Sequence, residues 1–443
     1  MSASQTISPA PRSMTARVLD EPRYALAWAL LTYVLCTLIL GYPALTGGFL
    51  VTPISDQYIG GFPVRDFAAQ SLKAGQGIPL WNPYIFGGLP YVAAMHGDIF
   101  YPTFLLRALL PTDIAMTWSF MIHMVLAGLF TYVFLRACGL GFWSSLIGGA
   151  AYMMSGPIAS YVSPGHDGKL YVSALLPLLL FMLIRGVRDG RVWAWGGIAL
   201  VTGLAVLSPH PQLLQYMLLA AGAFGLYLGF GSWNDSRLER GVAIRRLAFA
   251  LGAVAIGFLI GAIQYYPVLE YVDWSPRAGG KGYDHGSSFS FPISELFNMY
   301  LPQFTGILDN YWGDNGIHFH SEYLGPAMLI LATVALGASG KAAAMARSFK
   351  WFWLGVLVIS LLWALGGYTP FYLLIWNIVP GTQFFRAPST MIFVTTFALA
   401  VFTAIGAERL LTTRTFDMKL VYAWCGAATI IALLGVTRGL TNL

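Results

Sequence analysis

The polar residues best suited to chemistry lie where long apolar runs end. Asp56, in "SDQY", follows the first apolar run, and Asp98, in "MHGDIFYP", precedes a group of aromatic residues. A carboxylate beside a membrane surface can accept a proton from a hydroxyl nucleophile or bind a divalent cation. Arg65 and Asp66, in "PVRDF", are expected to face water. The alternative for each carboxylate is an ordinary solvated loop acid.

Two turns between apolar runs each offer a histidine. "SPGHDGKLY" contains His166, Asp167 and Lys169, and "LSPHPQLLQY" contains His210. Lysine can bind a phosphate, and histidine can relay a proton near neutral pH. The two turns therefore suggest one shared cavity, although polar turns between spans would have the same composition.

Arginine, histidine and tryptophan also occur in other loops. Arg277 in "WSPR" and Arg386 in "FFRAPS" each fit a phosphate, because guanidinium donates two parallel hydrogen bonds; an anchor at the lipid headgroups is the alternative. "HFHSE" places His318, His320 and Glu322 at alternate positions. In an extended strand they would share one face, so a divalent metal ion stays open as a cofactor. Trp312 can stack on a sugar ring or simply lie at the membrane interface.

The composition indicates what must position these residues. The chain has 443 residues, of which 57% are hydrophobic and 10% charged, whereas soluble proteins carry charge on about a quarter of their residues. Apolar runs long enough to cross a bilayer recur from residue 24 onward. We therefore predict an all-α polytopic membrane protein, a single transmembrane domain over 1–443. About eleven spans are expected, near 24–46, 113–135, 143–160, 170–185, 193–208, 213–231, 247–266, 323–340, 351–367, 389–407 and 420–437.

The distribution of basic residues predicts the orientation. Most lysines and arginines fall in the connections that share a side with the N-terminus, which places that side in the cytoplasm. The net charge of +6 is therefore a topology signal rather than a sign of nucleic-acid binding. The polar first segment precedes an apolar run too long for a cleavable signal, so this run is expected to remain as the first span.

The outer face carries the long polar segments. They are the first extracytoplasmic loop, 47–112, and the second large loop, 267–322. "FAAQSLKAG" is typical of a short amphipathic helix that ends at Gly75, and interfacial helices of this kind would roof a polar cavity. Segment 368–388 is apolar but broken by proline, which predicts a re-entrant or interfacial piece. Charged residues are almost absent from the span centres, which disfavours an ion-coupled transporter.

A series of short motifs in a fixed order resembles a known family. They are the Asp-Gln-Tyr at 56–58, "IPLWNPYIFGGLP", "FYP", "GHDGKLYVSALLPLLL", "SPHPQ", "LPQFTG", "YWG", "EYLG" and "FRAPS". In this order they resemble the YfhO-type bacterial membrane proteins, which are similar to the integral-membrane glycosyltransferases called GT-C. The motifs spread over residues 56–390, although YfhO-type proteins are often far longer.

The resemblance implies a GT-C-like fold and an activity. A sugar would pass from a polyprenyl-phosphate donor, whose tail lies in the membrane lipid, to a cell-envelope glycan, lipid or protein on the extracytoplasmic side of the bacterial inner membrane. An acid in the first external loop would activate the acceptor, and Asp56 has the matching position. By their chemistry, Asp98 and His166 are further catalytic candidates; Arg277, Arg386 and Lys169 are candidates for the donor phosphate; and Gln57, Asp167, His210, Glu322 and Trp312 are candidates for the substrate cavity.

Two other functions fit the same sequence. A lipid-linked sugar flippase would need a polar path across the bilayer. A non-catalytic scaffold in an envelope-assembly complex would use the outer loops only for docking.

Overall fold

The computed structural model describes residues 21–51, 55–95, 97–233, 236–276, 278–316, 318, 320–336, 347–413 and 418–436. Within these ranges the fold is all-α apart from one small β ribbon. The longer helices are α2 (Ala25–Leu40), α4 (Thr112–Ala137), α5 (Phe142–Met153), α7 (Asp167–Leu183), α8 (Trp193–Leu207), α9 (Pro211–Phe230), α10 (Arg240–Ile260), α11 (Ala262–Val272), α13 (Pro326–Leu336), α14 (Arg347–Ala364), α16 (Ile392–Thr413) and α17 (Met418–Val436).

The described residues contain six helices long and apolar enough to cross a membrane, which corrects the expected eleven spans. They cover Thr112–Ala137, Asp167–Arg188, Pro211–Phe230, Arg240–Ile260, Arg347–Ala364 and Pro388–Thr412. The class is therefore a multi-pass membrane protein. Four further apolar helices are shorter, namely Ala25–Leu40, Trp193–Leu207, Pro326–Leu336 and Met418–Ile431.

Backbone breaks explain why the hydropathy pattern overestimates the spans. The run predicted at 24–46 becomes helix α2 of 16 residues, about 24 Å long, followed by a turn at Gly41 and Pro43. A hydrocarbon core is about 30 Å thick, so this helix alone falls short of it. The run predicted at 143–160 divides into α5 and α6 (Gly156–Ala159). Hydropathy counts apolar residues, but glycine and proline decide where a helix ends.

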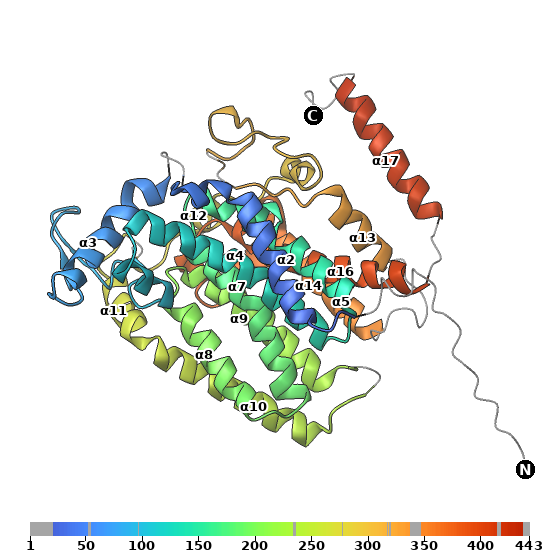
Figure 1. Cartoon of the computed structure of the whole chain (residues 1–443), viewed down its shortest axis with the longest axis horizontal. Coiled ribbons are helices and arrows are strands. Elements are labelled where there is room, and N and C mark those ends of the chain that lie inside the picture. Colours follow the sequence, from blue (N-terminus) through green and yellow to red (C-terminus); the bar gives the residue numbers. More distant parts are fainter. Residues whose placement is uncertain are drawn as a thin grey trace, which may run out of the picture.

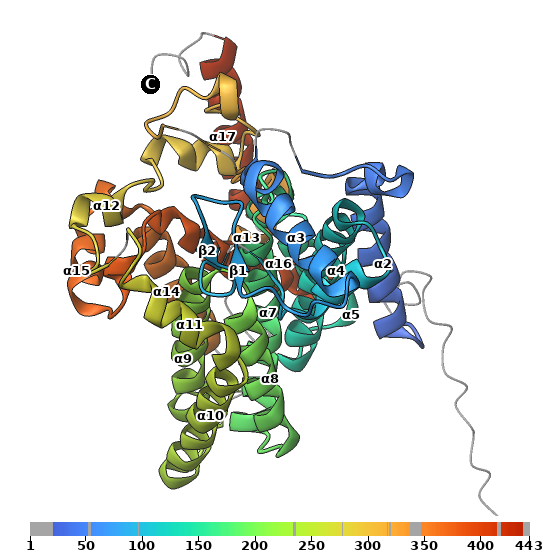
Figure 2. The ribbon, with the colours of Figure 1, turned by 90° about the vertical axis from the view of Figure 1, so that its left-hand side faces the viewer.

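The bundle is built around α16 and α7. α16 packs against α13, α5 and α14, while α7 packs against α4, α8 and α9. Both central helices are largely buried, whereas α10 and α14 expose most of their surface. Figures 1 and 2 show α8 and α10 side by side at one edge of the bundle, and α17 projecting away from it.

Elements of the first loop cover one end of the bundle. They are η2 (Gln57–Gly61), α3 (Phe62–Lys73), the antiparallel pair β1 (Trp81–Asn82) and β2 (Leu89–Pro90), and η3 (Pro102–Ala108). Figure 2, seen from that end, shows α3 and the ribbon in front of the helices. The predicted amphipathic helix is confirmed as α3, which ends at Lys73 just before Gly75 at φ +71°.

The second large loop is mostly irregular and holds several short helices. They are α12 (Tyr283–Ser287), η6 (Ile293–Met299) and η7 (Leu308–Asn310). Beyond α14, the segment predicted to be re-entrant forms α15 (Pro370–Ile378), whose nine residues are too few to cross a bilayer. Ala387, just before η10 (Pro388–Met391), has φ +56° and its amide N–H donates to Ser288 O, so the α15–α16 connection is tied to the second loop.

Candidate functional site

Five polar residues from four parts of the chain gather at the end of the bundle that the first loop covers. We call Asp56, His166, Lys169, His320 and Arg386 the rim cluster. Asp56 precedes η2, His166 and Lys169 begin α7, His320 precedes α13, and Arg386 precedes η10. His166 Nε2 lies 3.7 Å from Asp56 Oδ2, and His166 Nδ1 lies 2.9 Å from His320 Nε2. Lys169 Nζ lies 3.2 Å from the same His320 nitrogen.

The contacts determine the histidine tautomers. His166 Nε2 faces the Asp56 carboxylate, and a hydrogen bond to an ionised carboxylate needs a proton on that nitrogen. Neutral His166 therefore donates to Asp56 through Nε2, and its Nδ1 accepts from His320 Nε2.

The electrostatics of the rim cluster favour an ionised Asp56 beside a neutral His166. The hydrogen bond with His166 and the charges of Lys169 and Arg386 hold the pKa of Asp56 below its usual range. Burial, with the nearby charge of Lys169, lowers the pKa of His166 to about 4. The Asp56 side chain is 79% exposed, so it can reach an incoming molecule. At neutral pH the cluster therefore presents an ionised, exposed carboxylate beside a neutral imidazole.

Arg386 is held by its backbone while its side chain stays exposed. Gln212 Nε2 donates to Arg386 O over 2.6 Å. The guanidinium carbon lies 5.3 Å from the centroid of the Phe289 ring, a typical cation–π distance. The arginine can therefore offer its charge to an anion without reordering the main chain.

A second polar group is buried and structural. The buried ion network comprises Arg65, Asp98, Arg107, Asp167 and Gln57. Arg65 bonds to Asp98 Oδ1 over 3.1 Å and to Asp167, and Arg107 lies 3.3 Å from the other oxygen of Asp98. Gln57 accepts from Arg65 and donates to Asp167. The expectation that Arg65 faces water is wrong, because this side chain is buried and ties the first loop to α7.

The network places three sequence-predicted site residues away from solvent. Asp98 is fully buried between two arginines, which also lower its pKa against the effect of burial. Gln57 and Asp167 bind each other and Arg65. Removing one partner from such a network is costly, because a buried charge is left uncompensated. These contacts favour a structural role for all three.

The segment before α13 contributes side chains to two different polar groups. His318 Nε2 lies 3.0 Å from Glu322 Oε1, whereas His320 joins the rim cluster. Glu295 completes a group whose ligand atoms lie within 4.8 Å of one another, so Glu295, His318 and Glu322 can hold a metal ion. The sequence interpretation put His318, His320 and Glu322 on one face of a strand. The structure has no strand at these described positions, and His320 points elsewhere.

Two of the remaining predicted residues have local contacts, and one lies outside the described ranges. The turn with His210 packs against the start of α7, because Ser208 Oγ donates to Gly168 O over 3.0 Å. His210 caps α9, where Nδ1 accepts from the Leu213 amide over 3.4 Å. Trp312 packs edge-on against Phe304 and donates to the Phe304 carbonyl oxygen. Arg277 lies outside the described residues.

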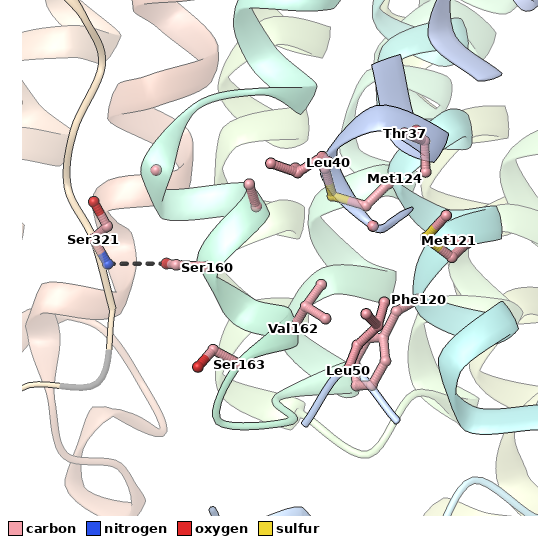
Figure 3. A pocket seen from close by; sticks show the side chains of 13 residues that line it. Thr37, Leu40, Leu50, Phe120, Met121, Met124, Ser160, Val162, Ser163 and Ser321 are labelled. Atoms are coloured by element: carbon pink, nitrogen blue, oxygen red, sulfur yellow. Dashed lines mark hydrogen bonds between the residues drawn. The ribbon is translucent and has the colours of Figure 1, made fainter. Parts of the chain in front are cut away.

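An apolar pocket of about 340 Å³ lies between α2, α4 and the segment that precedes α7, and no rim-cluster residue lines it. Its walls come from α2, α4 and the α6–η4 segment (Figure 3). Leu40, Met121 and Met124 line one side, while Ser160 and Ser321 line the other and are joined by a 3.0 Å hydrogen bond from the Ser321 amide. Ser321 directly follows His320, so the apolar pocket and the rim cluster share one strip of chain.

Protein families and curated proteins were compared with the chain. No protein-family profile matches the chain, and no curated protein matches it at a significant level. The geometry of the site therefore carries the functional argument.

The sequence interpretation missed two contributors. Glu295 lies in "ISELF" with no other ligand type beside it, and only the fold brings it to His318. Arg107 likewise gives no local signal. Both could be found only by knowing which segments pack together.

Proposed function

We propose that the chain is an integral-membrane glycosyltransferase of the GT-C type, which moves a sugar from a polyprenyl-phosphate donor to a cell-envelope acceptor. In this proposal the rim cluster faces the extracytoplasmic side of a bacterial cytoplasmic membrane. One observation carries the proposal: an exposed carboxylate, Asp56, lies within electrostatic reach of Lys169 and Arg386. The resemblance to the YfhO-type proteins supports the same reaction class.

The donor fits the two halves of the site. A polyprenyl phosphate has a long apolar tail and an anionic head, so it needs an apolar groove that ends at cations. The pocket lined by α2 and α4 offers the first. Lys169 and Arg386 offer the second, because ammonium and guanidinium groups form strong charge-assisted hydrogen bonds to phosphate oxygens.

The transfer step uses the same residues. The acceptor hydroxyl oxygen bonds to the anomeric carbon while the bond from this carbon to the phosphate oxygen breaks. The hydroxyl proton passes to the Asp56 carboxylate. The electron pair of the broken bond stays on the departing polyprenyl phosphate, whose charge Lys169 and Arg386 stabilise. His166 positions Asp56, and the bound donor and acceptor cover the carboxylate that the protein leaves 79% exposed.

The test is the variant Asp56→Asn. It keeps the shape of the side chain and removes the proton acceptor, so transfer should fall by about 100-fold or more. We would compare the envelope glycans of a deletion strain complemented with wild type, with Asp56→Asn, or with Asp273→Asn. Asp273 is an exposed acid of the second loop, outside the rim cluster, and its variant should behave as wild type.

Each result distinguishes the functions considered. Loss of the glycan with Asp56→Asn but not with Asp273→Asn supports the enzyme. Unchanged glycan with Asp56→Asn, at equal protein level in the membrane, overturns the mechanism and favours a scaffold. Movement of labelled lipid-linked sugar across liposomes by purified protein, retained in Asp56→Asn, favours a flippase.

A further inference from the structure

Glu295, His318 and Glu322 form a compact buried group that the proposed reaction does not use. We call them the second-loop triad. Glu295 lies in η6, and the other two lie between η7 and α13. All three residues are buried, and the ligand atoms lie within 4.8 Å of one another. The backbone holds both parts together, because the amides of Leu324 and Gly325 donate to Met299 O at the end of η6.

Within the described residues, the two carboxylates of the triad are only partly compensated by their partners. Glu295 and Glu322 form no ion pair with a lysine or arginine in the described part of the chain. Glu322 Oε2 is buried without a hydrogen-bond donor among the described residues. Burying a carboxylate oxygen without a hydrogen-bond donor costs free energy. We therefore expect this oxygen to bind a cation or a proton.

The surroundings are those of a ligand set. His318 Nδ1 lies 3.3 Å from Gly306 O, a contact in which the ring nitrogen donates to the carbonyl. This protonates Nδ1 and leaves Nε2, 3.0 Å from Glu322 Oε1, to hold either a cation or the proton that bridges the two atoms. The Tyr311 hydroxyl donates to Glu295 Oε1 over 2.6 Å, which orients that carboxylate. Support of this kind, from a carbonyl behind the imidazole and a donor behind the carboxylate, is typical of metal sites.

We propose that the second-loop triad binds one first-row divalent cation, of the Zn²⁺ or Mn²⁺ class. Tetrahedral ligation at about 2.1 Å separates ligand atoms by about 3.4 Å, which falls within the range of spacings here. The imidazole favours these ions over Mg²⁺ and Ca²⁺, which prefer oxygen ligands alone. Three protein ligands leave a further coordination position for water. Because His318 and His320 are two residues apart, the cation would also fix the strip of chain that presents His320 to the rim cluster.

Metal binding by the full chain in detergent tests the proposal without any activity assay. The protein is stripped with EDTA, passed over a size-exclusion column and titrated with zinc chloride or manganese chloride by calorimetry. We expect one equivalent bound per chain, with the same value from elemental analysis after desalting. Glu322→Gln and His318→Gln should each lose more affinity than removal of a supporting group, which typically costs about 10- to 100-fold.

Controls separate the triad from other sites. Glu270→Gln makes the same chemical change at an exposed position on α11, and His166→Gln removes a histidine of the rim cluster; both should retain binding. Tyr311→Phe keeps all three ligands and should bind about 10- to 100-fold more weakly. If a ligand variant does not remain monodisperse, the metal affinity of Tyr311→Phe tests the proposal in its place.

Two results would overturn the proposal. Absence of binding at millimolar Zn²⁺ and Mn²⁺ would mean that a proton shared by His318 and the glutamates satisfies the triad. Binding that survives Glu322→Gln and Tyr311→Phe but is lost in His166→Gln would place the metal in the rim cluster instead.

Discussion

His166 is the residue on which the electrostatics of the rim cluster depends. It faces Asp56, Lys169 and His320, and its largely buried ring contacts all but Lys169 directly. A neutral ring can still donate to Asp56 through Nε2, whereas an imidazolium would place a second positive charge beside Lys169. Burial and this charge lower the pKa of His166 from 6.5 to about 4.

The lowered pKa makes stability depend on pH in a definite direction. Below about pH 6.5 the unfolded chain binds a proton at His166, whereas the folded chain does not until about pH 4. Stability should therefore be complete above pH 6.5 and fall as the pH drops toward 4, by up to about 3 kcal/mol. We expect the apparent Tm of the wild type in detergent to fall more between pH 7.5 and 5 than that of His166→Gln. An equal fall in both proteins would contradict the account.

Neighbouring residues can serve different sites, and the sequence alone did not distinguish them. His318 and His320 are two residues apart, yet one contacts Glu322 and the other contacts His166. In a strand, residues at alternate positions such as His318 and His320 would share one face, but this segment is irregular. Their types correctly pointed to polar sites, while their partners depended on η6 and α7, which are distant in the sequence.

At the scale of elements, the start of α6 fixes the strip of chain that carries His320. The Gly156 amide donates to Tyr323 O over 2.6 Å. A Cβ at position 156 would lie 2.5 Å from Ser321 O and 2.7 Å from the Tyr323 amide nitrogen. Because both atoms belong to the backbone, a side chain cannot fit without moving this strip. Gly156 thus sets the distance between the α6–η4 segment and the strip of chain that contributes to the rim cluster and to the second-loop triad.

Gly156→Ala should therefore weaken the protein and displace His320. We expect a loss of about 1–3 kcal/mol from overpacking, measured as a lower apparent Tm in detergent. Gly196→Ala is the matched control, because position 196 lies inside α8 with no atom within 4 Å of the added Cβ. This substitution should be neutral or stabilising by about 0.5–1 kcal/mol, since alanine is the better helix former. A similar Tm for both variants would contradict this account, because it would show that residues 321–323 shift to accept the added Cβ at little cost in stability.

The class of the elements followed from composition, but their lengths did not. Helices α4, α7, α9, α10, α14 and α16 lie where long apolar runs predicted spans. The run at 143–160 fails as one span because Ser155 begins a break that allows Gly156 to approach Tyr323. The break depends on a contact between segments that are distant in the sequence, so hydropathy along the chain could not have located it.

At the scale of the whole molecule, the buried ion network links the first loop to the bundle. Arg65 from α3 contacts Asp167 at the start of α7, one residue after His166. The first loop therefore brings Asp56 and the α7 turn together through a contact that no solvent reaches. This arrangement requires both loops and the start of α7 to share one side of the membrane.

Single-cysteine labelling tests that sidedness and the proposed orientation. In a background with Cys36, Cys138 and Cys425 replaced by alanine, Gln76→Cys probes the first loop and Arg191→Cys probes the connection between α7 and α8, both at exposed positions. The excess of basic residues on the side of the N-terminus predicts that a membrane-impermeant maleimide labels Gln76→Cys in intact cells. Arg191→Cys should react only after permeabilisation. The reverse pattern would place the rim cluster in the cytoplasm, where a donor displayed on the outer leaflet cannot reach Asp56, and the glycosyltransferase proposal would fail with it.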